Sequence, residues 1–377
     1  MVGWMTLLAC SENSPHKERC QPLLSVLADS QTMAGLDPSG WDLLIRQASR
    51  AGLLSRLALE ADALGLTESL GKPIQRHLIA AGTLAERQRR AVAWEARKLD
   101  QALASLRIPV VLLKGAAYAL AELPPARGRL FADVDILVPK SALGEVEAAL
   151  LMHGWHGTQH SAYEQRYYRQ WMHELPPLTH IRRQTHLDVH HNLLPETARL
   201  KTMPERVLEA SEALEGYRAL RVPCLEDMVL HSATHLFHEG EWGHGLRDLV
   251  DLDQLLRHGM LRPNWWNGLM DRAEALNLMG PLALALRYVR RLLGTPVPHD
   301  ALLRSSSHLN QLAWPWRDAL FLGGLHTAHP SCRLPYSGLA EFLLYVRSHA
   351  LRMPLQLLLP HLLHKAWADM RGEKGNA

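Results

Sequence analysis

One stretch of this chain, residues 108–138, constrains its fold and chemistry more than any other. It begins with the apolar run Ile108–Leu113, which predicts a buried strand. The run stops at a lysine–glycine pair, and Ala116–Leu123 then predicts a short helix that the two following prolines end. After a loop, a second apolar run, Ile136–Val138, predicts another strand. The polar residues between these elements therefore lie at defined points of a strand–turn–helix–loop–strand unit.

Two carboxylates open the second strand. Asp133 and Asp135 are two residues apart, so on a strand they point to the same face, while Val134 points to the core. Same-face carboxylates repel each other unless a cation lies between them. Oxygen ligands favour a hard ion, so we expect Mg²⁺ or Mn²⁺ here.

Basic residues precede this pair of aspartates. Lys114, Arg127 and Arg129 suit a phosphate group. Carboxylates for a metal and cations for a phosphate together indicate a site of phosphoryl or nucleotidyl transfer. A D-x-D pair taken alone more often caps or solvates a strand end, and only the order of the surrounding elements favours the metal site.

A third carboxylate is available at Asp188. In the segment 185–191, Leu187 and Val189 alternate with Asp188, which predicts a strand with Asp188 on its polar face. Residues 173–184, with their paired prolines and a turn at Arg182-Arg183, predict a hairpin that leads into this strand. If the strand lies beside the D-x-D strand, Asp188 completes a triad.

Histidines flank this aspartate. His186 and His190 share the polar face with Asp188, so a zinc site of these residues is an alternative. We favour His190 as a substrate contact or a residue that orients a ligand.

Three motifs together resemble a known family. They are L-K-G-A-A at 113–117, R-x-x-x-D-V-D-I-L-V at 129–138 and L-D-V-H-H at 187–191. This set is similar to the bacterial uncharacterised nucleotidyltransferase family of the polymerase-β-like superfamily. The resemblance spans roughly residues 40 to 260 and includes the helical region from His231 to Asp251.

The resemblance implies an α+β fold, a small mixed-sheet nucleotidyltransferase core with helical regions before and after it. It also implies a nucleoside triphosphate donor and metal held by Asp133, Asp135 and Asp188. Lys114-Gly115 stands where the superfamily usually has a Gly-Ser pair, and the serine is absent. Lys114, Gly115 and Arg129 are then the candidate nucleotide or phosphate contacts. A catalytically degenerate nucleotide-binding or regulatory module stays open as an alternative.

The chain divides by composition into four segments. Residues 1–35 have no clear pattern, 36–105 are expected to be helical, 106–200 form the core, and 201–377 are expected to be helical. The Ala-, Leu- and Arg-rich run from Ile79 to Leu106 predicts one long helix.

Histidines and aspartates recur in the predicted C-terminal helices. His231, His235 and His238 share one helix face, and Arg247 and Asp251 lie on the next helix. These residues support a rival hypothesis, a His/Asp metal-dependent phosphohydrolase. We instead expect them to line the cleft. His190 and His235 are possible acceptor contacts, and Arg247 and Asp251 form an internal ion pair or are acceptor contacts too.

Composition limits the partners. The 377 residues carry a formal net charge of only +3, which makes a large nucleic acid an unfavoured partner. Four scattered cysteines without metal spacing favour a reducing cytoplasm, and no apolar stretch reaches the length of a membrane helix. We therefore predict a cytoplasmic, Mg²⁺- or Mn²⁺-dependent nucleotidyltransferase that moves a nucleoside monophosphate from an NTP, ATP by default, to an unidentified small-molecule or protein acceptor and releases pyrophosphate.

Overall fold

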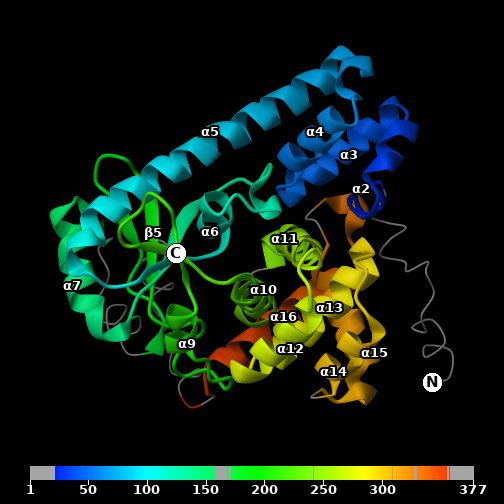
Figure 1. Cartoon of the computed structure of the whole chain (residues 1–377). Helices are drawn as coiled ribbons and strands as arrows, with labels where there is room; N and C mark the ends of the chain where they lie inside the picture. The colour runs from blue at the N-terminus through cyan, green and yellow to red at the C-terminus, as the bar shows by residue number, and fades with distance from the viewer. Residues whose placement is uncertain are drawn as a thin grey trace, which may run out of the picture.

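A mixed sheet of seven strands lies at one end of the molecule, and a group of helices lies at the other (Figure 1). The computed structural model describes residues 22–157, 168, 171–240, 242–307, 309–326, 329–354 and 356. The strand order is β3-β4-β5-β2-β1-β7-β6. The strands are β1 (Val110–Leu112), β2 (Asp133–Leu137), β3 (Trp155–Gly157), β4 (Leu178–His180), β5 (His186–His190), β6 (Glu212–Ala213) and β7 (Leu220–Val222). The predicted α+β class is confirmed.

The strand that carries Asp188 lies directly beside the D-x-D strand. β5 pairs with β2 in parallel, and the register sets Asp135 opposite Asp188. β4 and β5 form the predicted antiparallel hairpin, with Thr179 opposite His186. Because β5 follows β4 through a hairpin turn, β5 can lie parallel to β2 although no helix immediately precedes it.

Strand β1 is buried along its whole length because it lies between two other strands. It pairs with β2 antiparallel and with β7 parallel. Its residues Val110, Val111 and Leu112 are all fully buried. This pattern is typical of an interior strand covered on both faces, and it confirms the sequence prediction of a buried strand.

The short helix after β1 begins and ends earlier than the sequence predicted. Helix α6 spans Lys114–Leu120, and the prolines belong to a separate turn, η6 (Pro124–Ala126). Helix α7 (Leu143–Met152) follows β2, and its N-cap, Ala142, makes no side-chain hydrogen bond. The turn η7 (Lys140–Ala142) takes up the residues in front of it.

The N-terminal region is helical, as predicted. It contains α2 (Leu23–Ala28), η3 (Ser30–Gly35), α3 (Pro38–Ala51), α4 (Leu54–Ala63), η4 (Thr67–Ser69), α5 (Lys72–Leu103) and η5 (Ala104–Leu106). Helix α5 confirms the predicted long helix and crosses the molecule from α4 to the sheet (Figure 1). Residues 1–21, which include the first part of the poorly patterned segment, lie outside the described residues.

Polar side chains of α5 fasten three parts of the sheet region. Gln88 accepts a hydrogen bond from the backbone N–H of Phe131 at 2.8 Å. Glu95 forms an ion pair of 2.6 Å with Arg183 in the β4–β5 turn. Asp100 accepts from the backbone N–H of Ala219 at 2.8 Å, next to β7. The helix therefore acts as a brace for the loops and strands that surround the aspartates.

The segment 201–377 is mostly helical, but the expectation of helices alone was wrong. Strands β6 and β7 come from this segment and extend the sheet next to β1. Strands of two and three residues leave no recognisable alternation in a sequence. The sheet thus contains residues on both sides of position 200.

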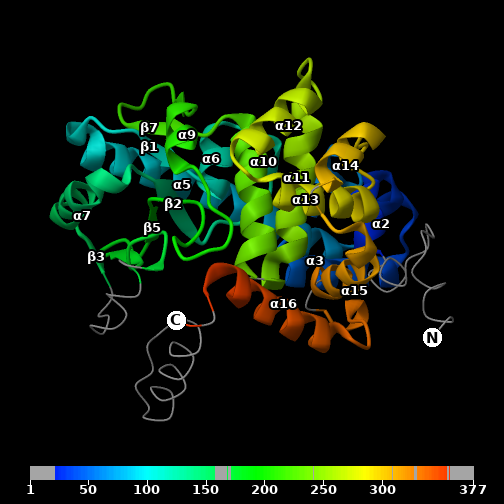
Figure 2. The same cartoon turned by 90° about the horizontal axis from the view of Figure 1, so that it is seen from below.

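The remaining helices pack on one another beside the sheet. Figure 2 shows α10, α11 and α13 side by side, with α16 across their ends. The elements are α9 (Pro204–Glu209), α10 (Leu225–Thr234), η8 (His235–Glu239), η9 (Trp242–His244), α11 (Gly245–Gly259), α12 (Trp265–Ala275), α13 (Met279–Leu293), α14 (His299–Ser306), η10 (Gln311–Ala313), α15 (Trp314–Gly324), η11 (Pro330–Cys332) and α16 (Ser337–Arg352).

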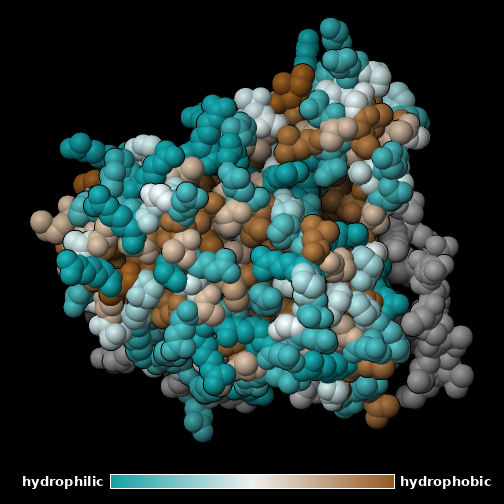
Figure 3. Space-filling view, viewed as in Figure 1, coloured by the Kyte–Doolittle hydropathy of each residue, from teal (hydrophilic) through white to brown (hydrophobic). Residues whose placement is uncertain are grey.

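The surface is polar over most of the face shown in Figure 3, with apolar residues scattered among the polar ones. In the part of the chain that the structure describes, no helix is both long and apolar enough to cross a membrane. Cys224 and Cys332 are not part of a disulfide bond.

The contacts that α5 makes with the sheet region lead to a testable prediction. Glu95→Ala leaves Arg183 without its buried partner, so we expect the free energy of unfolding to fall by about 3 kcal/mol. Urea denaturation followed by circular dichroism measures this change. Arg90→Ala, on an exposed side of the same helix, is the control and is expected to leave the unfolding midpoint unchanged. Equal effects of the two substitutions would contradict the role of α5.

Candidate active site

Three carboxylates meet where β2 and β5 run side by side. Asp133 and Asp135 lie on one face of β2, and Asp188 lies opposite Asp135 on β5. Oxygen atoms of the three side chains all lie within 4.8 Å of one another. Asp133 is exposed, Asp188 is half-buried and Asp135 is buried. The structure therefore brings together the triad that the alternating pattern of the two strands predicted.

The close approach of three carboxylates changes their proton affinities. Burial, followed by the charges of Asp135 and Glu174, raises the pKa of Asp188 to about 7. Burial and Asp135 likewise raise the pKa of Asp133. Burial also acts to raise the pKa of Asp135, but Lys114 and a hydrogen bond from His190 outweigh it and hold this pKa below its ordinary value. Like charges are thus crowded together at a place where a cation would relieve their repulsion.

The donor set fits a hard divalent cation. It consists of carboxylate oxygens only, one from each aspartate, all within 4.8 Å of one another. Mg²⁺ and Mn²⁺ prefer such oxygen ligands. The residues that would hold the ion are Asp133, Asp135 and Asp188.

The turn after β1 brings a lysine to the triad. Lys114 has a backbone φ of 44°, a left-handed conformation that is uncommon for a residue with a side chain. Its Nζ lies 3.8 Å from Oδ1 of Asp135. The sharp turn at Lys114 therefore places a positive charge beside the carboxylates.

Gly115 is needed for close packing. A Cβ atom at this position would lie 2.8 Å from Nε of Arg129 and 2.9 Å from the ring of Phe131. Such contacts are shorter than side chains tolerate, so only glycine lets the Arg129 loop lie against the start of α6. The glycine thereby brings Arg129 near Lys114.

A pocket opens between this turn, the loop 127–132 and the helices α10 and α11. It is lined by the candidate phosphate contacts and by two aspartates of the triad, together with residues from the C-terminal region. Of the predicted cleft contacts, His235, Arg247 and Asp251 line this same pocket with Lys114, Gly115, Arg129, Asp133 and Asp135. The predicted convergence of the two regions on one cleft is therefore seen in the structure.

The predicted ion pair between Arg247 and Asp251 is wrong. Asp251 instead pairs with Arg129, in a very short contact, and with Arg56 at 3.4 Å. Arg247 pairs with its neighbour Asp248 at 2.9 Å. Asp251 points from α11 toward the two arginines. Helical spacing in the sequence cannot show that side chains of other elements reach this carboxylate. Asp251 thus fixes the guanidinium group of Arg129 at the pocket wall.

His190 contacts the triad and does not share an ion with His186. Its Nε2 lies 3.2 Å from Oδ1 of Asp135. His186 is four residues away at the other end of β5, which separates the two by roughly 13 Å along a strand. Neither of the two groups with metal-ligand spacing among the described residues contains His186, so the alternative zinc site of His186, Asp188 and His190 is not formed.

The histidines of the rival hydrolase form no comparable cluster. Among the described residues, the two groups with metal-ligand spacing are the aspartate triad and a set near His190, and neither contains His231, His235 or His238. His235 begins a wide helical turn, η8, and lines the pocket. The structure therefore supplies no ligand set for that hypothesis.

Sequence reasoning missed three polar residues of this region. Asp248 and His244 line the pocket, and Glu174 lies 3.4 Å from His190. The spacing of three between Asp248 and Asp251 was a signal for a shared helix face. Nothing in the sequence ties Glu174 to His190, because the antiparallel bridge between them forms only in the folded sheet.

The comparisons agree with this geometry. A family model described as "Uncharacterised nucleotidyltransferase" matches residues 37–294, well over half of the chain. The chain belongs to this family. No curated protein matches it. The predicted family is confirmed, and the match contains the whole sheet and the pocket.

The charges of the site lead us to predict opposite effects on stability for two substitutions. Asp251→Asn leaves Arg129 and Arg56 buried without their carboxylate, so the free energy of unfolding should fall by about 3 kcal/mol. Asp188→Asn removes a carboxylate that its neighbours repel, so in metal-free buffer the thermal midpoint should rise. Differential scanning calorimetry of both variants measures the changes. Destabilisation by Asp188→Asn would contradict the crowding of like charges.

Proposed function

We propose that this chain transfers a nucleoside monophosphate from a nucleoside triphosphate to an acceptor, with a divalent cation at the aspartate triad, and releases pyrophosphate. The observation that carries the proposal is the register of β2 and β5, which gathers three carboxylates at the edge of a pocket lined by basic residues. Family membership supports nucleotidyl transfer in general. The cation, the donor and the acceptor are our proposal.

The aspartates would have distinct roles. Asp133 and Asp135 would hold Mg²⁺ or Mn²⁺, and Asp188 would complete the ligand set. When bound, the ion would activate the attacking oxygen and stabilise the leaving pyrophosphate. Asp188, half-buried and opposite Asp135, would also accept the proton of the acceptor hydroxyl.

The basic residues would bind the triphosphate. Lys114 would neutralise phosphate charge beside the triad, where its Nζ is already 3.8 Å from Asp135. Arg129 would contribute from the pocket wall, held in place by Asp251. Lys114 then takes the part that a Gly-Ser pair has in the wider superfamily. Catalysis would consist mainly of positioning and electrostatic stabilisation.

The far side of the pocket would receive the acceptor. His235 and Arg247 line the pocket from the C-terminal helical region. A hydroxyl or phosphate group fits hydrogen-bond donors of this kind.

For the nucleoside triphosphate, we take ATP as the default nucleotide.

Nucleotide binding is the first test. We expect non-hydrolysable ATP or GTP analogues to bind the wild type in isothermal titration calorimetry when Mg²⁺ is present, and binding to weaken at least tenfold without it. Asp133→Ala/Asp135→Ala should abolish the Mg²⁺-dependent part, because two of the three ligands are lost. Asp188→Asn should keep nucleotide binding but lose transfer of label from α-labelled ATP to an acceptor fraction.

Asp271→Ala is the matched control, since it removes an exposed carboxylate on α12 far from the triad in sequence and outside the pocket lining. Binding unchanged by the loss of Asp133 and Asp135 would refute the assignment of the triad. Metal-dependent binding without any transfer would instead favour the degenerate module.

A further inference from the structure

A second set of possible metal ligands lies against the end of β5. The segment before β4 runs antiparallel to it, and Glu174 forms a bridge with His190. The N–H of Leu175 donates to the carbonyl of Val189 at 2.9 Å, and the N–H of His191 donates to that of His173 at 2.8 Å. These backbone bonds fix His173 and Glu174 beside His190 independently of their side chains.

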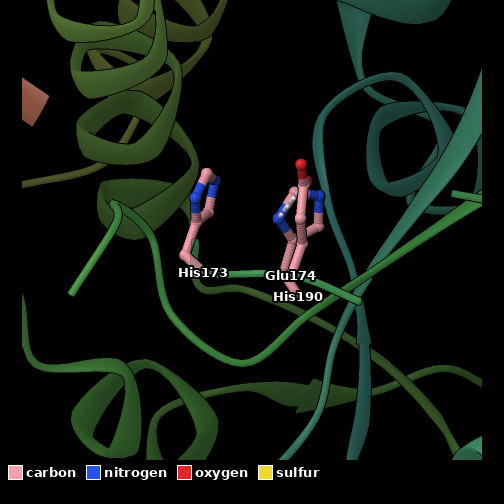
Figure 4. A group of neighbouring side chains, drawn as sticks. All are labelled: His173, Glu174 and His190. Carbon is pink, nitrogen blue, oxygen red and sulfur yellow. Dashed lines mark ion pairs between the residues drawn. The ribbon is translucent and has the colours of Figure 1, made fainter. Parts of the chain in front are cut away.

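The three side chains come together beside this bridge. Figure 4 shows the side chains of Glu174 and His190 together, with the ring of His173 to one side of the pair. Nδ1 of His190 lies 3.4 Å from Oε2 of Glu174, and the two imidazole rings have centroids 5.1 Å apart. One ligand atom from each residue lies within 4.8 Å of the others. Both histidines are buried.

We propose that His173, Glu174 and His190 form a site for a transition metal of the zinc class, separate from the aspartate triad. Two imidazoles and one carboxylate are a ligand set that Zn²⁺ and Co²⁺ prefer, whereas Mg²⁺ prefers oxygen alone. Ligands of one tetrahedral ion lie about 3.3 Å apart, so the ligand atoms here, within 4.8 Å of one another, would have to approach further to bind one ion. Three protein ligands leave a fourth position for water.

The other nitrogen of His190 supports this assignment. With Nδ1 toward Glu174 and the metal, Nε2–H donates to Oδ1 of Asp135 at 3.2 Å. A metal-bound histidine usually donates its second N–H to a carboxylate, and that bond fixes the ring. Here the carboxylate is a member of the triad, so the metal would also fix the orientation of Asp135.

The competing arrangement contains a proton in place of the metal. A doubly protonated His190 would join Asp135 and Glu174 through its two N–H groups, and the His173 ring would lie against the His190 ring without binding an ion. The two arrangements differ in the role of His173. A metal ion needs a ring nitrogen of His173 as a ligand, whereas a protonated His190 does not.

Cobalt binding distinguishes them. The full-length protein is treated with a chelator, dialysed into excess Mg²⁺ to fill oxygen-ligand sites, and titrated with Co²⁺. We expect one equivalent to bind with the visible absorption of a four- or five-coordinate Co²⁺ ion. His173→Ala and Glu174→Gln should each weaken this binding at least tenfold, since each removes one of three ligands. Zinc content measured by mass spectrometry should change in parallel.

Two variants serve as controls. His186→Ala removes a histidine from the same strand, and Asp133→Asn removes a ligand of the triad, so both should keep the cobalt absorption. Glu174→Gln preserves side-chain shape, and an unchanged melting curve of its metal-free form separates the loss of a ligand from misfolding.

The proposal is overturned if the wild type takes up no Co²⁺ above the Mg²⁺ background, or if His173→Ala keeps the absorption. It does not depend on the proposed function, because cobalt binding is measured without a nucleotide. Failure of nucleotide binding at the triad would leave this result unaffected.

Discussion

The parallel pairing of β2 with β5 is the constraint on which the rest of the site depends. It places Asp135 beside Asp188 and leaves Asp133 on the same face, so three carboxylates share a small volume. Such an arrangement opposes folding unless cations compensate it. The surrounding structure supplies a cation at Lys114 and a hydrogen bond from His190, which come from different parts of the chain.

Elements distant in sequence hold this arrangement in place. Helix α5 fastens the loop before β2 through Gln88 and the β4–β5 turn through Glu95. Helix α11 holds the wall of the pocket through the contact of Asp251 with Arg129. Helices before and after the sheet therefore contact the residues around the triad, and the family match from residue 37 to 294 includes both. Functional sites often contain charges that destabilise the fold locally, and contacts made by other parts of the chain offset this loss.

Much of this was predictable from local patterns. The alternation around Asp188 and the D-x-D pair placed the triad, because side-chain direction in a strand follows from sequence parity. The length of α5 followed from a run of good helix formers. The partners of Asp251 and Glu174 were not predictable, because they lie on other elements and depend on tertiary packing. Strands β6 and β7 were missed because they are too short to show a pattern.

Electron paramagnetic resonance of Mn²⁺ tests the central claim, that the triad holds a cation in contact with a nucleotide. The account predicts that Mn²⁺ bound together with a non-hydrolysable ATP analogue shows hyperfine coupling to phosphorus nuclei. Replacement of Asp135 by asparagine should remove that coupling. Absence of phosphorus coupling in the wild type, or the same coupling after the replacement, would contradict the account.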